Sequence, residues 1–164
     1  MNALLKEKIT RIKLLVSDID GVWTDGTITL NADGTESVSF SVLDGFGLMS
    51  LMRKGIEVAI ISGRDTVAVS SRAKRLGVKK VYLGKLNKGE IISKIIKESG
   101  LKKEEVASIG DDLPDLEMFA HSELRFAPKT AVPAVLDAAD YVCQLPAGKG
   151  ALREVCDLLI KDKA

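Results

Sequence analysis

Histidine and cysteine are both scarce in this sequence. His121 is the only histidine, which excludes catalysis by a zinc ion held by several His ligands. Cys143 and Cys156 are the only cysteines, and their spacing is not that of a C-x-x-C motif. We expect both thiols to be small core residues of a protein from a reducing compartment. The catalytic groups therefore have to be sought among other residue types.

A charge surplus and a long apolar run are missing as well. Lys and Arg number 24 against 23 Asp and Glu, so nothing favours nucleic acid or an acidic membrane surface as a partner. No apolar run approaches the roughly 20 residues that span a bilayer. Residues 1–11 mix charged and apolar side chains without the apolar block of a signal peptide. We expect a cytoplasmic protein with a single domain over residues 1–164.

Short aliphatic runs alternate with longer amphipathic stretches along the chain. The aliphatic runs predict buried parallel strands at 14–16, 58–61, 81–83 and 106–109, with an edge strand at 141–143. The amphipathic stretches predict helices near 47–54, 65–76, 88–99, 114–121, 131–138 and 151–161. This alternation predicts an α/β fold with a doubly wound, mainly parallel sheet, in which ligands bind beyond the carboxyl ends of the strands.

One segment departs from this alternation. Residues 27–30 and 37–40 alternate polar and apolar side chains, and they flank the sequence 31–34, which ends in Asp33-Gly34. Two short strands joined through Asp-Gly predict a β-hairpin. Because it directly follows the first strand, we expect the hairpin, about 26–40, to project near the ligand-binding end of the sheet.

Charged and hydroxyl side chains stand just beyond the predicted strands. They are Asp18 and Asp20 after the first strand, Ser62 after the second, Lys88 at the start of the helix after the third, and Asp111, Asp112 and Asp115 after the fourth. In a doubly wound sheet these positions converge on one crevice. Crowded carboxylates repel unless they bind a cation or take up protons. A hard divalent ion with oxygen ligands, Mg²⁺ first, resolves that repulsion.

Magnesium beside a carboxylate indicates phosphoryl transfer, which needs positioning and charge neutralisation more than covalent work. In this reading Asp18 attacks phosphorus and forms an acyl phosphate. Asp20 protonates the leaving alkoxide and then takes a proton from the hydrolytic water. Ser62 holds a phosphoryl oxygen, and Lys88 balances negative charge on the nucleophile and phosphoryl group. Asp111 completes the metal site.

These residues resemble the four motifs of the haloacid dehalogenase superfamily. The motifs are Asp18-Ile19-Asp20-Gly21-Val22, Ser62, Lys88, and Gly110-Asp111-Asp112-Leu113-Pro114-Asp115. The resemblance implies that Asp18, Asp111 and the backbone carbonyl of Asp20 bind the metal, with Asp115 supporting the site. For Asp112 two readings stay open, direct metal contact and a helix N-cap or supporting acid.

The intervals between the motifs hold no cap domain. The hairpin and one helix fill the interval from Asp18 to Ser62, and one helix and one strand fill the interval from Ser62 to Lys88. An open crevice admits water, which weakens electrostatic stabilisation. Either a large substrate or another subunit must cover it. A hairpin with unpaired edges favours a second subunit, so we expect a homo-oligomer assembled through the hairpin.

Within the superfamily, the chain is most similar to the 3-deoxy-D-manno-octulosonate 8-phosphate phosphatase family. The similar segments are 18–26, 42–47, 62–64, Arg72, 76–78, 87–88 and 148–155. The resemblance implies a homotetramer with hairpins joined at its centre, a role in lipopolysaccharide precursor synthesis, and a glycine-rich tail that reaches a neighbouring active site. Ala147 departs from the family's usual Gly-Gly-Arg/Lys-Gly tail. The implied substrate contacts are Asp20, Ser41, Val42, Leu43, Asp44, Gly45, Arg64, Arg72 and Lys88.

Several alternatives stay open from the sequence. Phosphatases of nine-carbon keto-sugar phosphates carry Glu-Lys where this chain has Arg64-Asp65, which favours the octulosonate substrate. A phospho-receiver domain also combines acids, a hydroxyl and a lysine, although its acidic pair stands at the first strand. Arg72 also fits a solvated helix face, Asp44-Gly45 an N-cap and turn, and Trp23 a core or interface anchor.

Overall fold

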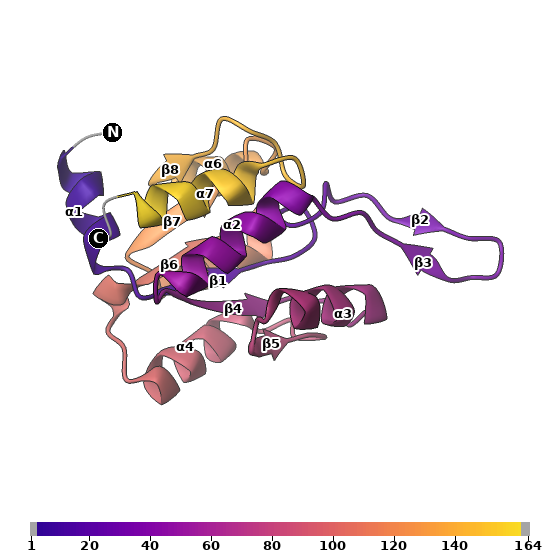
Figure 1. Cartoon of the computed structure of the whole chain (residues 1–164), viewed down its shortest axis with the longest axis horizontal. Helices are drawn as coiled ribbons and strands as arrows, with labels where there is room; N and C mark the ends of the chain where they lie inside the picture. The colour runs from indigo at the N-terminus through magenta and orange to yellow at the C-terminus, as the bar shows by residue number, and fades with distance from the viewer. Residues whose placement is uncertain (1–2, 162–164) are drawn as a thin grey trace.

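The computed structural model describes residues 3–161 and has three layers, a parallel sheet between two layers of helices (Figure 1). The strand order is β5-β4-β1-β6-β7-β8, and every pairing is parallel. The strands are β1 (Leu14–Ser17), β4 (Glu57–Ile61), β5 (Lys80–Tyr82), β6 (Val106–Ile109), β7 (Leu124–Ala127) and β8 (Tyr141–Val142). The predicted α/β fold with a doubly wound parallel sheet is therefore confirmed.

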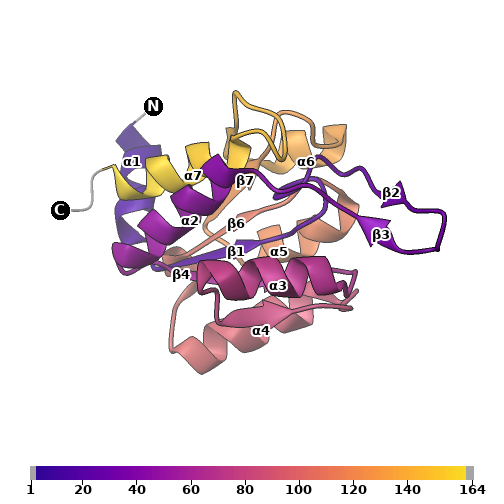
Figure 2. The same ribbon diagram turned by 45° about the vertical axis from the view of Figure 1, so that its right-hand side comes forward.

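Each face of the sheet buries its own set of helices. One face packs against α1 (Ala3–Arg11), α2 (Val42–Arg53), α3 (Val67–Leu76) and α7 (Ala151–Ile160). The other face packs against α4 (Lys88–Ser99), α5 (Leu116–Ala120) and α6 (Pro133–Ala138). Helices α2 and α7 lie side by side over the first face in both views (Figures 1 and 2). Two 3₁₀ turns, η1 (Lys103–Glu105) and η2 (Leu113–Asp115), directly precede β6 and α5.

Strand β1 lies in the middle of the sheet and is fully buried. Its side chains alternate between the two cores, with Leu15 on one side and Leu14 and Val16 on the other. The chain leaves β1 toward β4 on one side and later returns to β6 on the other. The carboxyl end of β1 is thus the point where the winding direction changes, which is where such sheets bind ligands.

The predicted hairpin is confirmed and has shorter strands than expected. Strands β2 (Thr29–Leu30) and β3 (Glu36–Ser37) pair antiparallel and extend away from the sheet (Figures 1 and 2). Gly34 has a φ of 83°, which a glycine adopts without strain. Asp33 Oδ1 accepts the Thr35 backbone N–H at 3.0 Å and closes the turn. Between residues 18 and 88, all of them described, there is no cap domain.

The five strands predicted for the parallel sheet agree with the observed ones to within one residue at each end, but β7 was missed. Arg125 interrupts the apolar pattern of this segment, so the sequence does not predict a buried strand there. Its guanidinium is satisfied by a two-point contact with Asp140, at 2.8 Å and 3.0 Å. A paired arginine near the sheet edge is compatible with a strand that sequence periodicity does not reveal.

Four helices begin elsewhere than predicted, of which α3 and α6 each begin two residues later, at Val67 and Pro133. Helix α2 starts at Val42 rather than at residue 47, because the Ser41 hydroxyl caps it by accepting the Asp44 N–H at 3.3 Å. Helix α5 starts at Leu116 rather than at residue 114, because Pro114 lies in the preceding 3₁₀ turn η2. Among residues 3–161, no helix is long and apolar enough to cross a membrane.

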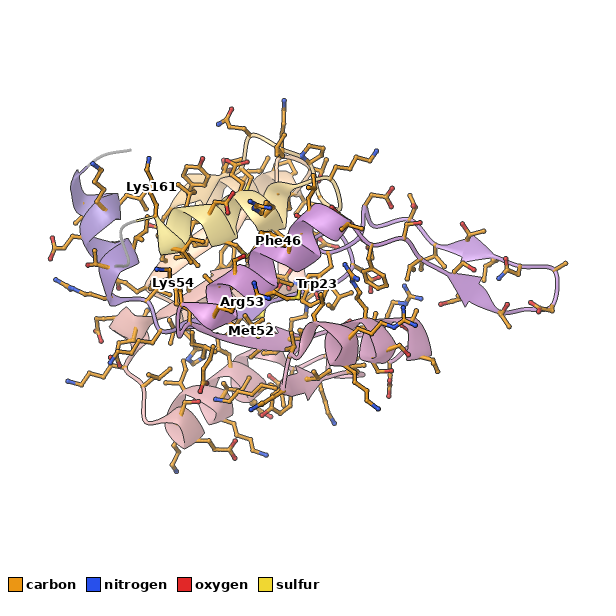
Figure 3. The ribbon with its side chains drawn as sticks, in the orientation of Figure 1. Trp23, Phe46, Met52, Arg53, Lys54 and Lys161 are labelled. Atoms are coloured by element: carbon orange, nitrogen blue, oxygen red, sulfur yellow. The ribbon has the colours of Figure 1, made fainter. Side chains whose placement is uncertain are left out.

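Core positions expected from the sequence are occupied as predicted. Both cysteines are buried, and burial raises the pKa of each thiol well above its usual value, for Cys143 to about 12. Trp23 is also buried, and its indole Nε1–H donates to Ser17 Oγ at 2.9 Å. By contrast, Phe46 is an exposed residue of α2 (Figure 3). The Arg153 guanidinium lies 5.2 Å from the centre of its ring.

Candidate active site

Asp18 directly follows β1 and is buried beside a lysine. Its backbone N–H donates to the Ile109 carbonyl of β6 at 3.1 Å, which fixes the residue at the sheet edge. Lys88, the first residue of α4, places its Nζ 2.9 Å from Asp18 Oδ1 and 2.6 Å from Asp115 Oδ1. All three residues are less than one tenth exposed. One buried ammonium therefore neutralises part of the charge of two buried carboxylates.

Asp115 shapes the loop that follows β6. Its Oδ2 accepts the backbone N–H groups of Asp111 at 2.9 Å and Asp112 at 3.2 Å. Gly110 makes this fold possible, because a Cβ there would lie 2.3 Å from the Asp115 Cβ. Asp112 is exposed, and its Oδ1 accepts the Leu113 N–H at 2.7 Å as the N-cap of η2. The sequence left two roles open for Asp112, and the structure shows it making the contacts of an N-cap.

Three carboxylates meet beneath this loop. One oxygen each from Asp18, Asp111 and Asp115 lies within 4.8 Å of the others. Burial, then repulsion from Asp115, raises the pKa of Asp18 to about 7 despite the nearby Lys88. Burial, then repulsion from Asp18, likewise raises the pKa of Asp111 to about 7. The predicted convergence of these acids at one edge of the sheet is thus observed.

The cluster holds a buried carboxylate oxygen that lacks a partner. Asp111 Oδ1 is buried and has no hydrogen-bond partner. Gly21, with a φ of +80°, passes so close that a Cβ would lie 2.0 Å from Asp111 Oδ2. An orphaned carboxylate oxygen among further carboxylates is a donor set that suits a hard divalent ion such as Mg²⁺. The residues present therefore fit the predicted magnesium site.

Ser62 and Arg64 approach the same cleft from the end of β4. Ser62 is buried, its N–H donates to the Tyr82 carbonyl at 3.0 Å, and its Oγ accepts the Arg64 N–H at 3.2 Å. Arg64 Nη1 lies 3.1 Å from Asp20 Oδ1, and Arg64 Nη2 pairs with Glu36 of β3. No sequence pattern indicates Glu36 as a site residue, because tertiary structure sets the hairpin's orientation toward Arg64.

A cleft of about 490 Å³ joins these groups. It is lined by Asp18, Asp20, Gly26, Ser62, Gly63, Arg64, Lys85, Leu86, Lys88, Asp111, Asp112, Pro114, Asp115 and Glu117. All four residues predicted to be catalytic belong to this lining, as do the predicted ligand Asp111 and the predicted substrate contact Arg64. Lys85, Leu86 and Glu117 were not predicted, since no motif marks them.

The remaining predicted substrate contacts form a separate group outside that lining. Arg72 Nη2 donates to the Ser41 carbonyl at 3.0 Å, and its guanidinium lies 5.9 Å from the centre of the Phe40 ring. Gly45 allows this approach, because a Cβ there would lie 2.4 Å from Arg72 Nη2. Arg72 is therefore half-buried rather than on a solvated face. Val42 and Leu43, which begin α2, are exposed.

Asp44 is engaged with the last helix of the chain. Its Oδ1 accepts the Arg153 N–H at 2.8 Å and its Oδ2 the Gly150 N–H at 3.3 Å, so it caps α7. Burial raises the pKa of Asp44, although these two N–H groups oppose the shift. The sequence suggested an N-cap near Asp44-Gly45, but Asp44 caps a helix that begins more than 100 residues later. Its predicted substrate contact stays a prediction.

The glycine-rich segment before α7 lies against the turn that follows Asp18 and Asp20. The Gly148 N–H donates to the Val22 carbonyl at 3.1 Å. A Cβ at Gly148, whose φ is +64°, would lie 2.7 Å from the Asp25 backbone nitrogen. In this chain the segment therefore supports the loop of its own active-site cleft. The implied contact with a neighbouring site stays a prediction.

Comparison with known proteins agrees with this geometry. Residues 80–154 match a family model described as haloacid dehalogenase-like hydrolase. A 3-deoxy-D-manno-octulosonate 8-phosphate phosphatase of Haemophilus influenzae is 40% identical over 96% of this chain and 87% of its own length. One from Escherichia coli strain K12 is 40% identical over 93% of this chain and 81% of its own length.

Solved structures extend the likeness to three dimensions. The phosphatase of the same name from Yersinia pestis matches with a TM-score of 0.96 and 37% identity, covering 98% of this chain and 87% of that one. The Moraxella catarrhalis enzyme, solved with magnesium, phosphate and KDO, gives a TM-score of 0.95 at 36% identity, covering 98% and 92%. The chain belongs to the 3-deoxy-D-manno-octulosonate 8-phosphate phosphatase family of haloacid dehalogenase-like hydrolases.

Proposed function

We propose that this protein is a Mg²⁺-dependent phosphatase that hydrolyses 3-deoxy-D-manno-octulosonate 8-phosphate to the free keto-sugar acid and phosphate. The observation that carries the proposal is the cluster of Asp18, Lys88, Asp111 and Asp115 at the carboxyl end of β1. Relatives that share about 40% of its residues bear that activity in their names. The phospho-receiver reading is set aside by family membership.

In the proposed mechanism, the Asp18 carboxylate attacks phosphorus. A new bond forms from the carboxylate oxygen to phosphorus while the bond from phosphorus to the sugar oxygen breaks. Asp20 gives its proton to the departing sugar oxygen, then takes a proton from water as that water attacks the acyl phosphate. Inorganic phosphate leaves, and Asp18 and Asp20 return to their starting states.

The other cleft residues stabilise charge during these steps. Lys88 Nζ already contacts Asp18 and is positioned to balance the negative phosphoryl oxygens. The Ser62 hydroxyl holds a phosphoryl oxygen, and the Arg64 guanidinium binds an anionic group of the substrate. Asp18, Asp111 and the Asp20 carbonyl would hold Mg²⁺, which when bound neutralises and orients the phosphoryl group. Asp115 keeps the Asp111 loop in place.

The open cleft needs a cover, and the same chain can supply it as a homotetramer assembled through the hairpin, about 26–40. The hairpin exposes Ile28 and Leu30, and the start of α2 exposes Val42, Leu43 and Phe46. Such neighbouring apolar side chains favour burial against another copy. In that assembly we expect Ser41 to Gly45 and Arg72 to contact the substrate near the interface between subunits. We also expect one domain over the whole chain and a cytoplasmic location.

A phosphate-release screen over sugar phosphates with Mg²⁺ tests the function. We expect the eight-carbon keto-sugar acid phosphate to be hydrolysed fastest, ahead of the nine-carbon analogue. Asp18→Asn should abolish turnover, and chelation should remove it reversibly. Equal, negligible rates on all keto-sugar acid phosphates would refute the substrate, whereas full activity in excess EDTA would refute the metal.

A further inference from the structure

Arg64 has two acidic partners, and one of them has no place in the proposed mechanism. Its Nη1 lies 3.1 Å from Asp20 Oδ1, and its Nη2 makes an ion pair and hydrogen bond with Glu36 Oε2. Asp20 lies in the loop after β1, whereas Glu36 opens strand β3 of the projecting hairpin (Figure 2). One guanidinium thus connects the proposed general acid to the hairpin.

Charge balance makes this arrangement unsuitable for a third carboxylate. Arg64 carries one positive charge and already faces two carboxylates. An anionic group of a substrate that approaches the guanidinium would meet occupied donors and electrostatic repulsion. Glu36 is the more exposed partner, with 41% of its side chain accessible against 28% for Asp20. An ion pair that is this exposed contributes little to stability, so it is easily exchanged.

We propose that Glu36 occupies the position on Arg64 that the substrate's carboxylate takes on binding, and that Glu36 thereby sets the affinity for carboxylate-bearing substrates. This inference rests on the proposed function. On binding, the substrate carboxylate replaces Glu36 at Nη2, and Glu36 turns toward water. Asp20 keeps its contact with Nη1 and stays in place for proton transfer. The two carboxylates compete for one bidentate cation, which is chemistry that arginine favours.

The substitution Glu36→Gln tests the proposal because it keeps the shape and removes the charge. We expect KM for the eight-carbon keto-sugar acid phosphate to fall about two- to five-fold, the factor that an exposed ion pair represents. The value of kcat should stay within about two-fold, since Glu36 touches no reacting atom. KM for p-nitrophenyl phosphate, which has no carboxylate, should not change.

Two further variants separate competition from a general effect of charge. Glu57→Gln removes the same charge from an exposed residue at the amino end of β4, where Glu57 pairs with Lys80, and should leave both KM values unchanged. In an Arg64→Ala background, Glu36→Gln should no longer lower KM, because the shared cation is gone. Circular dichroism and light scattering on each variant verify that fold and assembly are intact.

Each contrary result has its own meaning. An unchanged or raised KM for the sugar acid phosphate in Glu36→Gln overturns the competition between the two carboxylates. An equal fall for both substrates also overturns it, because Arg64 would then bind the phosphoryl group. If the wild type hydrolyses no keto-sugar acid phosphate, the proposed function fails and takes this inference with it. Normal wild-type turnover with no Glu36 effect overturns the inference alone.

Discussion

Asp111 is a carboxylate whose surroundings disfavour its charge. Its Oδ1 is buried without a hydrogen-bond partner, and burial and the neighbouring acids raise its pKa to about 7. A carboxyl whose pKa rises on folding destabilises the fold increasingly as pH increases from its unfolded value, 3.8, to about 7, and fully above that. A bound divalent cation removes the cost, because it supplies the missing partner.

This imbalance predicts a crossover in stability for Asp111→Asn. At pH 8 without divalent ions, the variant should unfold at a higher temperature than the wild type, since it lacks the unfavourable charge. Each kcal/mol corresponds to about 2–4 °C for a chain of this size. With excess Mg²⁺ the order should reverse, because only the wild type binds the ion well. Differential scanning calorimetry with and without Mg²⁺ measures both.

The control is Asp137→Asn, which removes the same charge from an exposed position on α6. It should respond to Mg²⁺ as the wild type does. An Asp111→Asn variant that Mg²⁺ stabilises as strongly as the wild type would contradict the metal assignment.

At the scale of residues, the sequence predicts some of the site residues and not others. Asp18, Ser62, Lys88 and Asp111 could be predicted because each stands at the boundary of a strand or helix, and strand ends converge. Glu36 could not, since its partner Arg64 is 28 positions away and the hairpin's direction decides the contact.

At the scale of elements, α7 depends on a cap supplied by α2. Both Asp44 carboxylate oxygens accept N–H groups at the start of α7, and the preceding Gly148 contacts the turn after Asp20. The exposed backbone donors at a helix start need such acceptors. The sequence predicts α7 well but not its cap, because capping patterns involve only residues adjacent to the helix.

Asp44→Ala should therefore lower the free energy of unfolding by about 0.5–2 kcal/mol, the usual cost of losing a cap. Asp44→Asn, which keeps one oxygen acceptor, should lie between this variant and the wild type. Urea denaturation followed by circular dichroism measures the differences. Asp157→Ala, at a half-exposed position on the same helix, is the control. If Asp44→Ala and Asp157→Ala lose equal stability, the cap contributes nothing.

The same scale explains the misplaced elements. Strand β7 was missed because Arg125 breaks its apolar run. The Arg125 guanidinium is accommodated in the sheet by its two hydrogen bonds to Asp140. The start of α2 was missed because Gly45 and Gly47 lower helix propensity there. Packing explains why glycine occupies both positions, because a Cβ at Gly45 would collide with Arg72 and a Cβ at Gly47 would collide with Arg153.

For the whole molecule, the hairpin is the part whose presence the fold does not require. Residues 25–37 are exposed, and none of them belongs to a hydrophobic core cluster of the described chain. An exposed segment that adds so little burial contributes little to stability. The sequence predicted the hairpin from its Asp-Gly turn, but what pairs with its edges depends on other chains, and no pattern within one chain specifies that.

Replacing residues 28–37 with a short glycine linker should therefore leave a folded protein that no longer assembles. We expect light scattering to give the mass of one chain where the full-length protein gives four, with a nearly unchanged circular dichroism spectrum. Hydrolysis of p-nitrophenyl phosphate should persist, since Asp18, Lys88 and Asp111 lie outside the hairpin. The rate on the sugar acid phosphate should fall sharply, because the cleft then lacks its cover and admits water. A shortened chain that is still tetrameric, or equally active on both substrates, would show that the hairpin neither joins the subunits nor helps to enclose the substrate.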